Sequence, residues 1–440
     1  MHTTGHGAKL YDYGLKLAAL DHGALFARTS TRHLHLGPHI RVVSLITSPG
    51  DHAGLWGVAD REYTRSGKPN ITATGDPGTY QGQHDLWDAL GQKWGTWITA
   101  TLAKDQLPQL AVANRDAAAR LAWSAKRIIT HPATTETAAA AARYIITAYS
   151  RMKAPGQQVF LPMTDALREH YASGADTADE THLGLWLDWP TLPENWDREQ
   201  TALDEDFEAE GTRFGKAVDR MHAAQGNMRS TRAARIVPLL TPVLTARHDD
   251  ITRALGLLRR HPGPTMEAAT QRYQDDARAM ARYVGNAATP GYKSVPARVA
   301  TLHEREGYTA YWRTSLWAQD HMEATRATAS GDVLMGEVDD GALVVAGPVR
   351  ARPGDTFTTA GGTATVESLA TSASTTTVTF DVLLTDEDTM LTPTIQKYRP
   401  PRWVKPGWVH GPDAPARGPG GAGDRGDLTA WAESLKTPRH

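Results

Sequence analysis

The sequence predicts a multidomain, mainly α protein with a small irregular α/β N-terminal region, a central helical bundle, a small C-terminal β-barrel-like module and an extended tail. Its 440 residues exceed one ordinary domain. Apolar residues recur with a helical period from about residue 107, and short Val/Thr-rich segments alternate with turn residues from residue 331. The predicted regions are therefore 1–106, 107–330, 331–395 and 396–440.

In the N-terminal region, one strand is predicted over residues 40–47. This segment is short, apolar and β-branched, with Gly37-Pro38 before it and Pro49-Gly50 after it. Residues 66–78 are dense in glycine, proline, serine and aspartate, which are typical of turns. We therefore expect long loops around a small sheet.

The central region shows the periodicity of packed helices. Ala117, Leu121, Ala125 and Ile128 fall on one face of a helix that His131-Pro132 ends. Further proline and glycine clusters mark the breaks between successive helices. The other predicted helices span residues 138–149, 164–171, 200–224, 230–260 with interruptions at Pro238 and Pro242, 264–286 and 296–327.

The β module is predicted from five short segments with tight turns between them. Each turn contains residues that favour a tight reversal, such as Asp339-Asp340-Gly341. Short strands at this spacing indicate a small closed or half-open barrel. The predicted strands span residues 331–338, 342–349, 356–359, 363–370 and 375–384.

The tail begins with a Pro/Gly-rich stretch, residues 398–427, that is unable to build a core. Asp427 is placed to cap a last short helix with Leu428, Trp431 and Leu435 on one stripe. We interpret this stripe as a docking element for a protein partner or for the protein's own oligomer. The alternative is that it packs back onto its own chain.

The amino-acid composition excludes several kinds of site and of protein. There is no cysteine, which rules out disulfides, a thiol nucleophile and cysteine-based zinc sites. No run of about 18 apolar residues is present, and residues 1–14 lack an apolar signal-peptide region. We therefore expect a cytoplasmic protein that does not contact membranes. No sequence motif predicts a cofactor.

Charge is strongly segregated along the chain. Residues 163–211 carry a net charge of −12, and the adjoining residues 212–262 carry +7. Arginines gathered on one helical face would bind the phosphates of nucleic acid, or they would pair with the acidic segment inside the fold. Within the basic segment, residues 244–256 resemble the first helix of a helix-turn-helix motif with its turn at Gly256. The second helix is missing, because Pro262 follows.

The tail segment 398–408 interleaves cations with aromatic residues, a pattern that suits a nucleic-acid strand or an apolar strap on the protein itself. We predict nucleic-acid contacts, DNA included, from the basic helix and this segment. The predicted contact residues are Arg229, Arg232, Arg235, Arg253, Arg259, Arg260, Arg399, Arg402, Trp403, Lys405 and Trp408.

A second hypothesis is an enzyme, for example a metal-dependent hydrolase, with its site in the N-terminal region. His33, His35 and His39 would share a face of an extended segment and are weak candidates for metal ligands. Histidines in a polar loop explain the same pattern. The site would also draw on nearby acidic and histidine residues, namely Asp51, His52 and Asp60.

Two further pairs of polar residues are spaced one helical turn apart, His303-x-x-Glu306 and Asp320-x-x-Glu323. Neither completes the pattern of a carboxylate-bridged dimetal site, so solvent-exposed helix faces are expected. The leading hypothesis is therefore a non-catalytic nucleic-acid-associated or scaffolding protein, and the enzyme is the alternative.

Overall fold

The computed structural model describes residues 6–48, 54–129, 131–175, 179–191, 212, 214–220, 232–285 and 308–394. About half of the structure is helical and 21% is strand, and the strands form three sheets. The prediction of a mainly α protein is therefore wrong.

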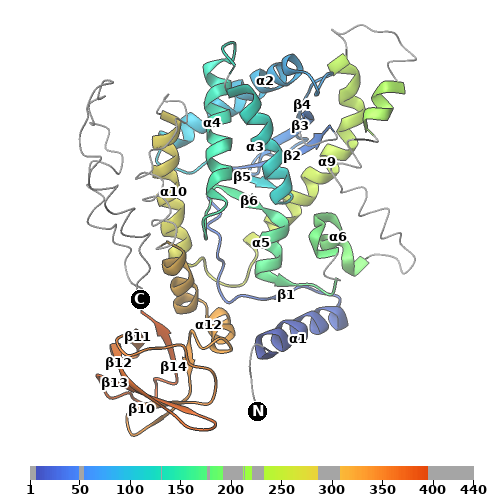
Figure 1. Ribbon diagram of the computed structural model, residues 1–440. Helices are drawn as coiled ribbons and strands as arrows, with labels where there is room; N and C mark the ends of the chain where they lie inside the picture. The colour runs from blue at the N-terminus through green and yellow to red at the C-terminus, as the bar shows by residue number, and fades with distance from the viewer. Residues whose placement is uncertain are drawn as a thin grey trace, which may run out of the picture. The chain divides into compact units, whose positions relative to one another are not determined.

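The central sheet has five strands in the order β4-β3-β2-β5-β6 (Figure 1). β2 (Ile40–Thr47) is antiparallel to β3 (Leu55–Glu62) and parallel to β5 (Gln109–Val112). β4 (Asn70–Ala73) and β6 (Phe160–Pro162) form its edges. β5 and β6 lie within the segment predicted to be a helical bundle. They have four and three residues, too few for a periodicity argument to detect.

β2 matches the predicted strand at both ends, and all eight of its residues are buried. Val43 and Leu45 belong to the core on one face of the sheet, and Ile40 and Val42 to the core on the other. Burial of every residue is typical of a strand that helices cover on both faces.

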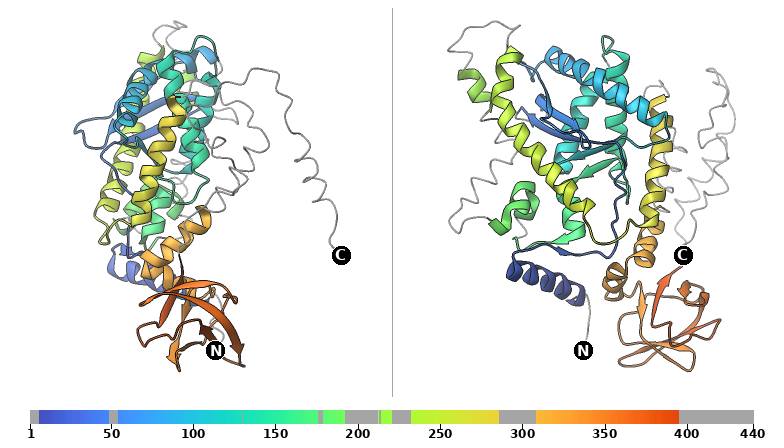
Figure 2. Two further views of the ribbon diagram at one scale, coloured as in Figure 1. Left: turned by 90° about the vertical axis from the view of Figure 1, so that its left-hand side faces the viewer. Right: turned by 180° about the vertical axis from the view of Figure 1, so that it is seen from behind.

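The first face is covered by four helices (Figure 2). α2 (Tyr80–Leu102) and α4 (Glu136–Arg151) pack on each other, and α3 (Arg115–Ile129) and α10 (Glu267–Gly285) complete the layer. The predicted face of α3 is buried along its length. The expectation of long loops in the N-terminal region is wrong for the 23-residue helix α2.

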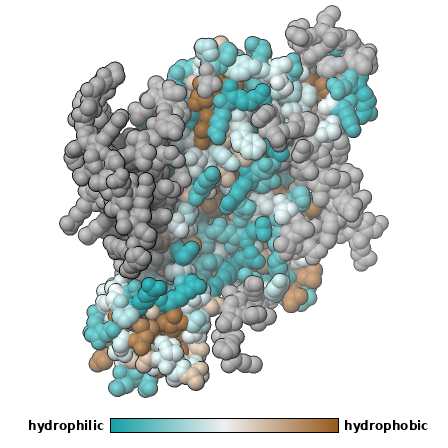
Figure 3. Space-filling model, in the orientation of Figure 1, coloured by the Kyte–Doolittle hydropathy of each residue, from teal (hydrophilic) through white to brown (hydrophobic). Residues whose placement is uncertain are grey.

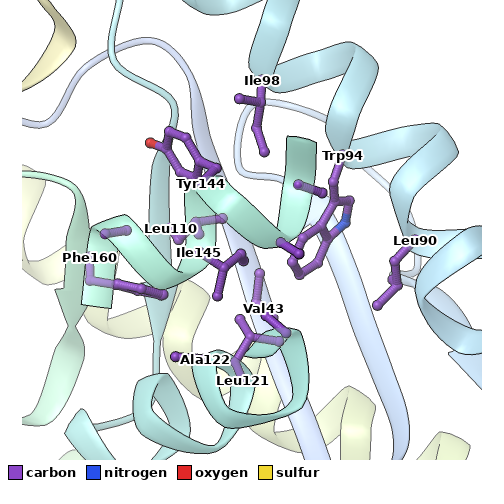
Figure 4. Close-up of a cluster of buried hydrophobic side chains, with 14 of the residues drawn as sticks. Val43, Leu90, Trp94, Ile98, Leu110, Leu121, Ala122, Tyr144, Ile145 and Phe160 are labelled. Carbon is purple, nitrogen blue, oxygen red and sulfur yellow. The ribbon is translucent and has the colours of Figure 1, made fainter. Parts of the chain in front are cut away.

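Figure 4 shows the centre of this core, where Trp94 of α2, Leu121 of α3 and Ile145 of α4 gather near Val43 of β2. Each of the four is at most 1% exposed. Burial of side chains this large contributes roughly 1.5–3 kcal/mol each. The sheet and these helices therefore form one cooperative unit.

The opposite face is covered by α9 (Arg232–Arg259), which packs on β2, β3 and β4. The helix continues through Pro238 and Pro242, so the predicted interruptions are wrong. Both prolines are exposed, and water can satisfy the backbone carbonyls that they leave unpaired. Gly256 also lies inside the helix, which removes the predicted helix-turn-helix turn.

A seven-stranded, nearly closed sheet occupies the segment where a small barrel is predicted. Its core includes Phe357 and Phe380, whose rings meet edge to face at 6.2 Å. The strand order is β8-β14-β11-β12-β13-β10-β9. The strands are β8 (Leu334–Met335), β9 (Glu337–Asp339), β10 (Ala342–Val345), β11 (Thr356–Thr359), β12 (Gly362–Thr371), β13 (Thr376–Phe380) and β14 (Met390–Pro393).

Shorter elements connect these parts, and the two-stranded third sheet pairs β1 with β7. Residues 308–319 are also helical. The remaining elements are α1 (His6–His22), β1 (Phe26–Ala27), α5 (Met163–His170), β7 (Tyr171–Ala172), η1 (Asp179–Thr181), α6 (Leu183–Asp188), η2 (Trp189–Thr191) and α12 (His321–Thr328).

Candidate functional site

Two arginines at the C-terminal end of α9 lie beside an aromatic residue from β3's end. The Arg259 guanidinium carbon is 4.5 Å from the centre of the Tyr63 ring, a cation–π geometry. A methyl group placed on Gly256 would lie 3.4 Å from Arg260 Nη1 and 3.8 Å from Tyr63 Oη, so these two groups face the same position. We call Arg32, Tyr63, Arg259 and Arg260 the Arg259 cluster.

Arg32 belongs to this cluster through the last turn of α9. Its Nη1 donates to the carbonyl of Leu258 at 3.4 Å, and its Nε donates to the carbonyl of Leu34 at 3.1 Å. Burial lowers the pKa of Arg32, and the charge of Arg259 lowers it further. Two guanidinium groups of like charge therefore lie close enough to repel.

The charges of Arg259 and Arg260 have no carboxylate partner within salt-bridge distance among the described residues. Arg253, two turns earlier on α9, differs: its Nη2 contacts Asp188 at 2.6 Å and its Nη1 contacts Asp250 at 3.1 Å. Asp188 belongs to the acidic segment 163–211. Arg253 is therefore paired inside the fold, as the alternative to nucleic-acid binding expects.

Most of the other residues predicted to contact nucleic acid lie outside the described part of the chain. Arg235 lies half-buried near the start of α9. Arg232 begins α9, but its side chain is outside the described residues, as is the whole of Arg229. The tail candidates also lie outside the described residues: Arg399, Arg402, Trp403, Lys405, Trp408, Leu428, Trp431 and Leu435.

A second polar centre joins the N-terminal loop to two helices, with three of its four side chains buried. His33 is 2% exposed, and its Nε2 donates to Asp320 at 3.0 Å while its Nδ1 donates to Glu169 at 2.9 Å. The amide of His33 donates to Nε2 of His170 at 2.9 Å. We call His33, Glu169, His170 and Asp320 the His33 cluster. It joins the N-terminal loop to α5 and α12.

The His33 cluster contains one charged and one neutral imidazole. Burial disfavours the His33 cation, but hydrogen bonds to Asp320 and Glu169 outweigh it and raise the pKa of His33 to about 9. Burial lowers the pKa of His170 to about 4, and the charge of His33 adds to this effect. His33 is therefore an imidazolium between two carboxylates at neutral pH and holds no lone pair for a metal or a proton.

Asp320 overturns the expectation of a solvent-exposed helix face, because it is fully buried. Its carboxylate accepts from the amides and hydroxyls of Ser30 and Thr31 at 2.9–3.2 Å and from two amides that begin α12. Burial favours the neutral acid, but the bonds from His33, Thr31 and Ser30 hold the pKa of Asp320 well below its usual range. The spacing of Asp320 and Glu323 in the sequence is typical of the start of a helix, where Asp320 is the N-cap. No local sequence pattern indicates its contacts with Ser30, Thr31 and His33.

The three histidines predicted as weak metal candidates do not converge. His33 is engaged as above, whereas Nδ1 of His35 is 3.2 Å from the hydroxyl of Thr270 and its ring packs on Tyr273. Residues 33–39 form no β-strand. No group of three candidate ligands is placed to hold a metal among the described residues.

The other residues of the hypothetical N-terminal enzyme site are also separated. Asp60 is fully buried and pairs with Arg41 across the β2–β3 ladder. Asp51 and His52 lie outside the described residues. The described part of the chain therefore gathers no catalytic set from this group.

The carboxyl ends of the parallel strands are where open α/β sheets usually bind ligands. Here the described charged side chains are paired, Arg115 after β5 with Asp165 after β6, and the uncharged ones are engaged within the fold. Gln83 of α2 exchanges two hydrogen bonds with the backbone of Leu55 and accepts from Ser124 at 2.8 Å. Asn114, after β5, caps α3 through the amide of Ala117 at 2.9 Å. These two amide side chains therefore support the fold.

A groove of about 510 Å³ lies between α12, α1 and the barrel. Its lining includes Tyr11, Met322, Met335 and Val345, and Figure 3 shows apolar side chains gathered on the barrel. Arg326 also lines it, but contacts with Asp12 and Glu323 neutralise this charge. The groove therefore offers apolar contact without a free charge to orient a ligand.

Comparison with known proteins gives no relative. No family model, curated protein or solved structure matches the chain. In the part of the chain that the structure describes, no helix has both the length and the apolar character required to cross a membrane.

Proposed function

We propose that the protein is a non-catalytic nucleic-acid-binding protein that contacts phosphates through the Arg259 cluster. The observation that carries this proposal is the position of Arg259 and Arg260, two cations beside Tyr63 with no carboxylate partner among the described residues. A planar guanidinium donates two parallel hydrogen bonds to one phosphate, which an ammonium group does not. A phosphate would also relieve the repulsion between Arg32 and Arg259.

The helix dipole offers a simpler explanation for cations at this place. A positive charge near a helix C-terminus gains about 0.3–1 kcal/mol, and arginines there bind the last carbonyls. The helix dipole explains the position of Arg32, which donates to the carbonyl of Leu258. It does not explain why two more cations, the exposed Arg259 and Arg260, lie at the same place. Those two remain available to an anion from solution.

Binding rather than catalysis is proposed because the polar groups described at the ends of the parallel strands are engaged within the fold. Gln83 and Asn114 are hydrogen-bonded to backbone groups, and Arg115 is paired with Asp165. A scaffolding role, through the stripe of Leu428, Trp431 and Leu435, extends the same proposal. The proposal includes a cytoplasmic location, which cell fractionation would test.

Substitution of Arg259 and Arg260 by Ala tests the proposal in the full-length protein. We expect weaker binding to a fluorescent DNA duplex and a salt dependence, log K against log salt, that is shallower by about 1.8 if two phosphate contacts are lost. Arg253→Ala is the matched control, because that arginine lies on the same helix and is already paired with Asp188. If both variants bind like the parent protein, or the parent protein does not bind at all, the proposal is wrong.

A further inference from the structure

Helix α1 turns two of its charged side chains toward its own protein and several large apolar side chains toward solvent. Asp12 contacts Arg28 at 3.6 Å and Arg326 at 3.2 Å. Nζ of Lys16 contacts Glu180 at 2.9 Å. These ion pairs lie on the side of the helix that packs against β1, β7 and α12 (Figure 1). The rest of the chain therefore determines which face of α1 is left outside.

The outer face of α1 carries an exposed apolar stripe. Tyr13, Leu17 and Leu20 are 64%, 60% and 56% exposed, and their spacing of four and three residues places them on one face of the helix. A surface helix normally buries its apolar stripe and exposes its charges. Four of the nine exposed large apolar side chains among the described residues lie on α1, so this exposure is concentrated rather than scattered. We call Tyr13, Leu17 and Leu20 the α1 stripe.

The surroundings of the α1 stripe suit a second helix. A methyl group added to Gly14 would meet no atom within 4 Å, so a neighbouring helix can come close there. Asp21 is exposed and, seven residues further on, lies on the same side of α1 as Gly14. A partner must therefore place apolar side chains against the stripe and leave one carboxylate in water.

A second copy of α1 meets both requirements when the two helices pack antiparallel with a twofold axis at Leu17. Symmetry then makes each contact reciprocal, so that Tyr13 of each copy packs on Leu20 of the other. On the other flank Gly14 meets Asp21 of the other copy, and the missing side chain leaves that carboxylate a path to water.

Charge favours the antiparallel direction over the parallel one. The two Asp21 carboxylates are then about 12 Å apart along the helices, at a rise of about 1.5 Å per residue. A parallel pair would bring the two carboxylates side by side and would also align the two helix dipoles, and both effects are repulsive.

We propose that the α1 stripe is the contact between two copies of this chain, which form an antiparallel helix pair with Leu17 on the twofold axis. One helix face buries less than the roughly 800 Å² per partner of a standard interface, so the dimer should dissociate on dilution. This inference goes beyond the proposed function and does not depend on it.

Sedimentation equilibrium of the nuclease-treated full-length protein over a concentration series tests the dimer. We expect the average mass to rise from one copy to two as the concentration increases. Leu17→Glu places two like charges at the axis and is expected to remain a monomer throughout. Leu17 is exposed, so the melting temperature of the dilute variant should equal that of the dilute parent. Leu383→Glu is the matched control, because this barrel leucine is 83% exposed, and it should dimerise like the parent.

The register is tested by single introduced cysteines, because the chain contains none of its own. The two thiols of Leu17→Cys meet at the axis, so a mild oxidant should give a covalent dimer. The two positions of Asp21→Cys are about 12 Å apart, beyond the roughly 6.8 Å between Cα atoms that a disulfide spans, and should not cross-link.

Several results would overturn the inference. They are a parent protein that stays a monomer, a dimer that survives Leu17→Glu, and a cross-link through Asp21→Cys but not through Leu17→Cys. Loss of the dimer on removal of residues 427–440 would assign the contact to the stripe of Leu428, Trp431 and Leu435 instead. A lower melting temperature of dilute Leu17→Glu would show that the protein's own chain covers the α1 stripe, which also contradicts the proposal.

Discussion

Replacing Asp320 by Asn removes one charge from the His33 cluster while keeping the size of the side chain. The carboxylate accepts hydrogen bonds from backbone and side-chain donors of Ser30 and Thr31, from His33 and from the first turn of α12. An amide has one acceptor oxygen, so its NH₂ group would face donors. His33 would also lose one of its two anionic partners.

The magnitude follows from burial and from the pKa of His33. Breaking a buried ion pair by removing one partner costs about 3–5 kcal/mol. The rise of the His33 pKa from 6.5 to about 9 corresponds at pH 7 to about 3 kcal/mol of stability from both carboxylates together. Glu169 remains as a partner in the variant, so we expect a loss of about 3 kcal/mol in the free energy of unfolding.

The pH dependence gives a second readout. The folded pKa of His33 is raised, so its contribution is complete below pH 6.5 and is lost as pH rises through about 9. The parent protein should therefore lose stability between pH 7 and pH 9.5, and Asp320→Asn should lose less over the same interval. Urea unfolding followed by tryptophan fluorescence measures both quantities.

Asp332→Asn is the control, because Asp332 pairs with an Arg350 side chain that is 65% exposed. Such a pair is worth at most about 1 kcal/mol. Hydrogen exchange should show faster exchange in α12 and residues 28–35 of Asp320→Asn only. Equal stability and equal pH slopes in the parent protein and Asp320→Asn would refute the reasoning.

Three further outcomes are expected. Gly91→Ala should lower the free energy of unfolding by about 1–3 kcal/mol, because its methyl group would lie 2.4 Å from Cα of Ala138. Gly14→Ala is the control: open space surrounds Gly14, so urea unfolding should show no change or a gain in stability. The pKa of His170 is lowered to about 4, so its contribution to stability is present above pH 6.5 and is lost as pH falls toward 4. In His170→Gln the free energy of unfolding should therefore depend less on pH between 6.5 and 4. Limited proteolysis should cut near Gly331 or beyond residue 400 before it cuts inside 340–385, and early cuts there would argue against an autonomous barrel.

Local sequence features were enough to place several elements. The β-branched run at residues 40–47 gives β2 its bounds, and the spacing of Leu121 and Ile128 identifies the buried face of α3. The alternation of short Val/Thr-rich segments with turns locates β10 to β13 of the barrel. It predicts one strand where β8 and β9 lie, and it misses β14. In each case the signal is a period or a turn within about ten residues, which the chain carries without reference to its partners.

Tertiary structure decided which elements share a core and which charges are free. β5 and β6 became strands because they complete the sheet beside β2, and α9 remained one helix because its prolines face solvent. Arg253 and Arg259 lie on the same basic helix, but among the residues that the structure describes only Arg253 meets a carboxylate. Asp320 and His33 are 287 residues apart, and their pairing depends on how α12 packs against the N-terminal loop. The sequence by itself determined the kinds of side chain present and their local periodicity, whereas burial and pairing depend on contacts between distant segments, which only the folded chain brings together.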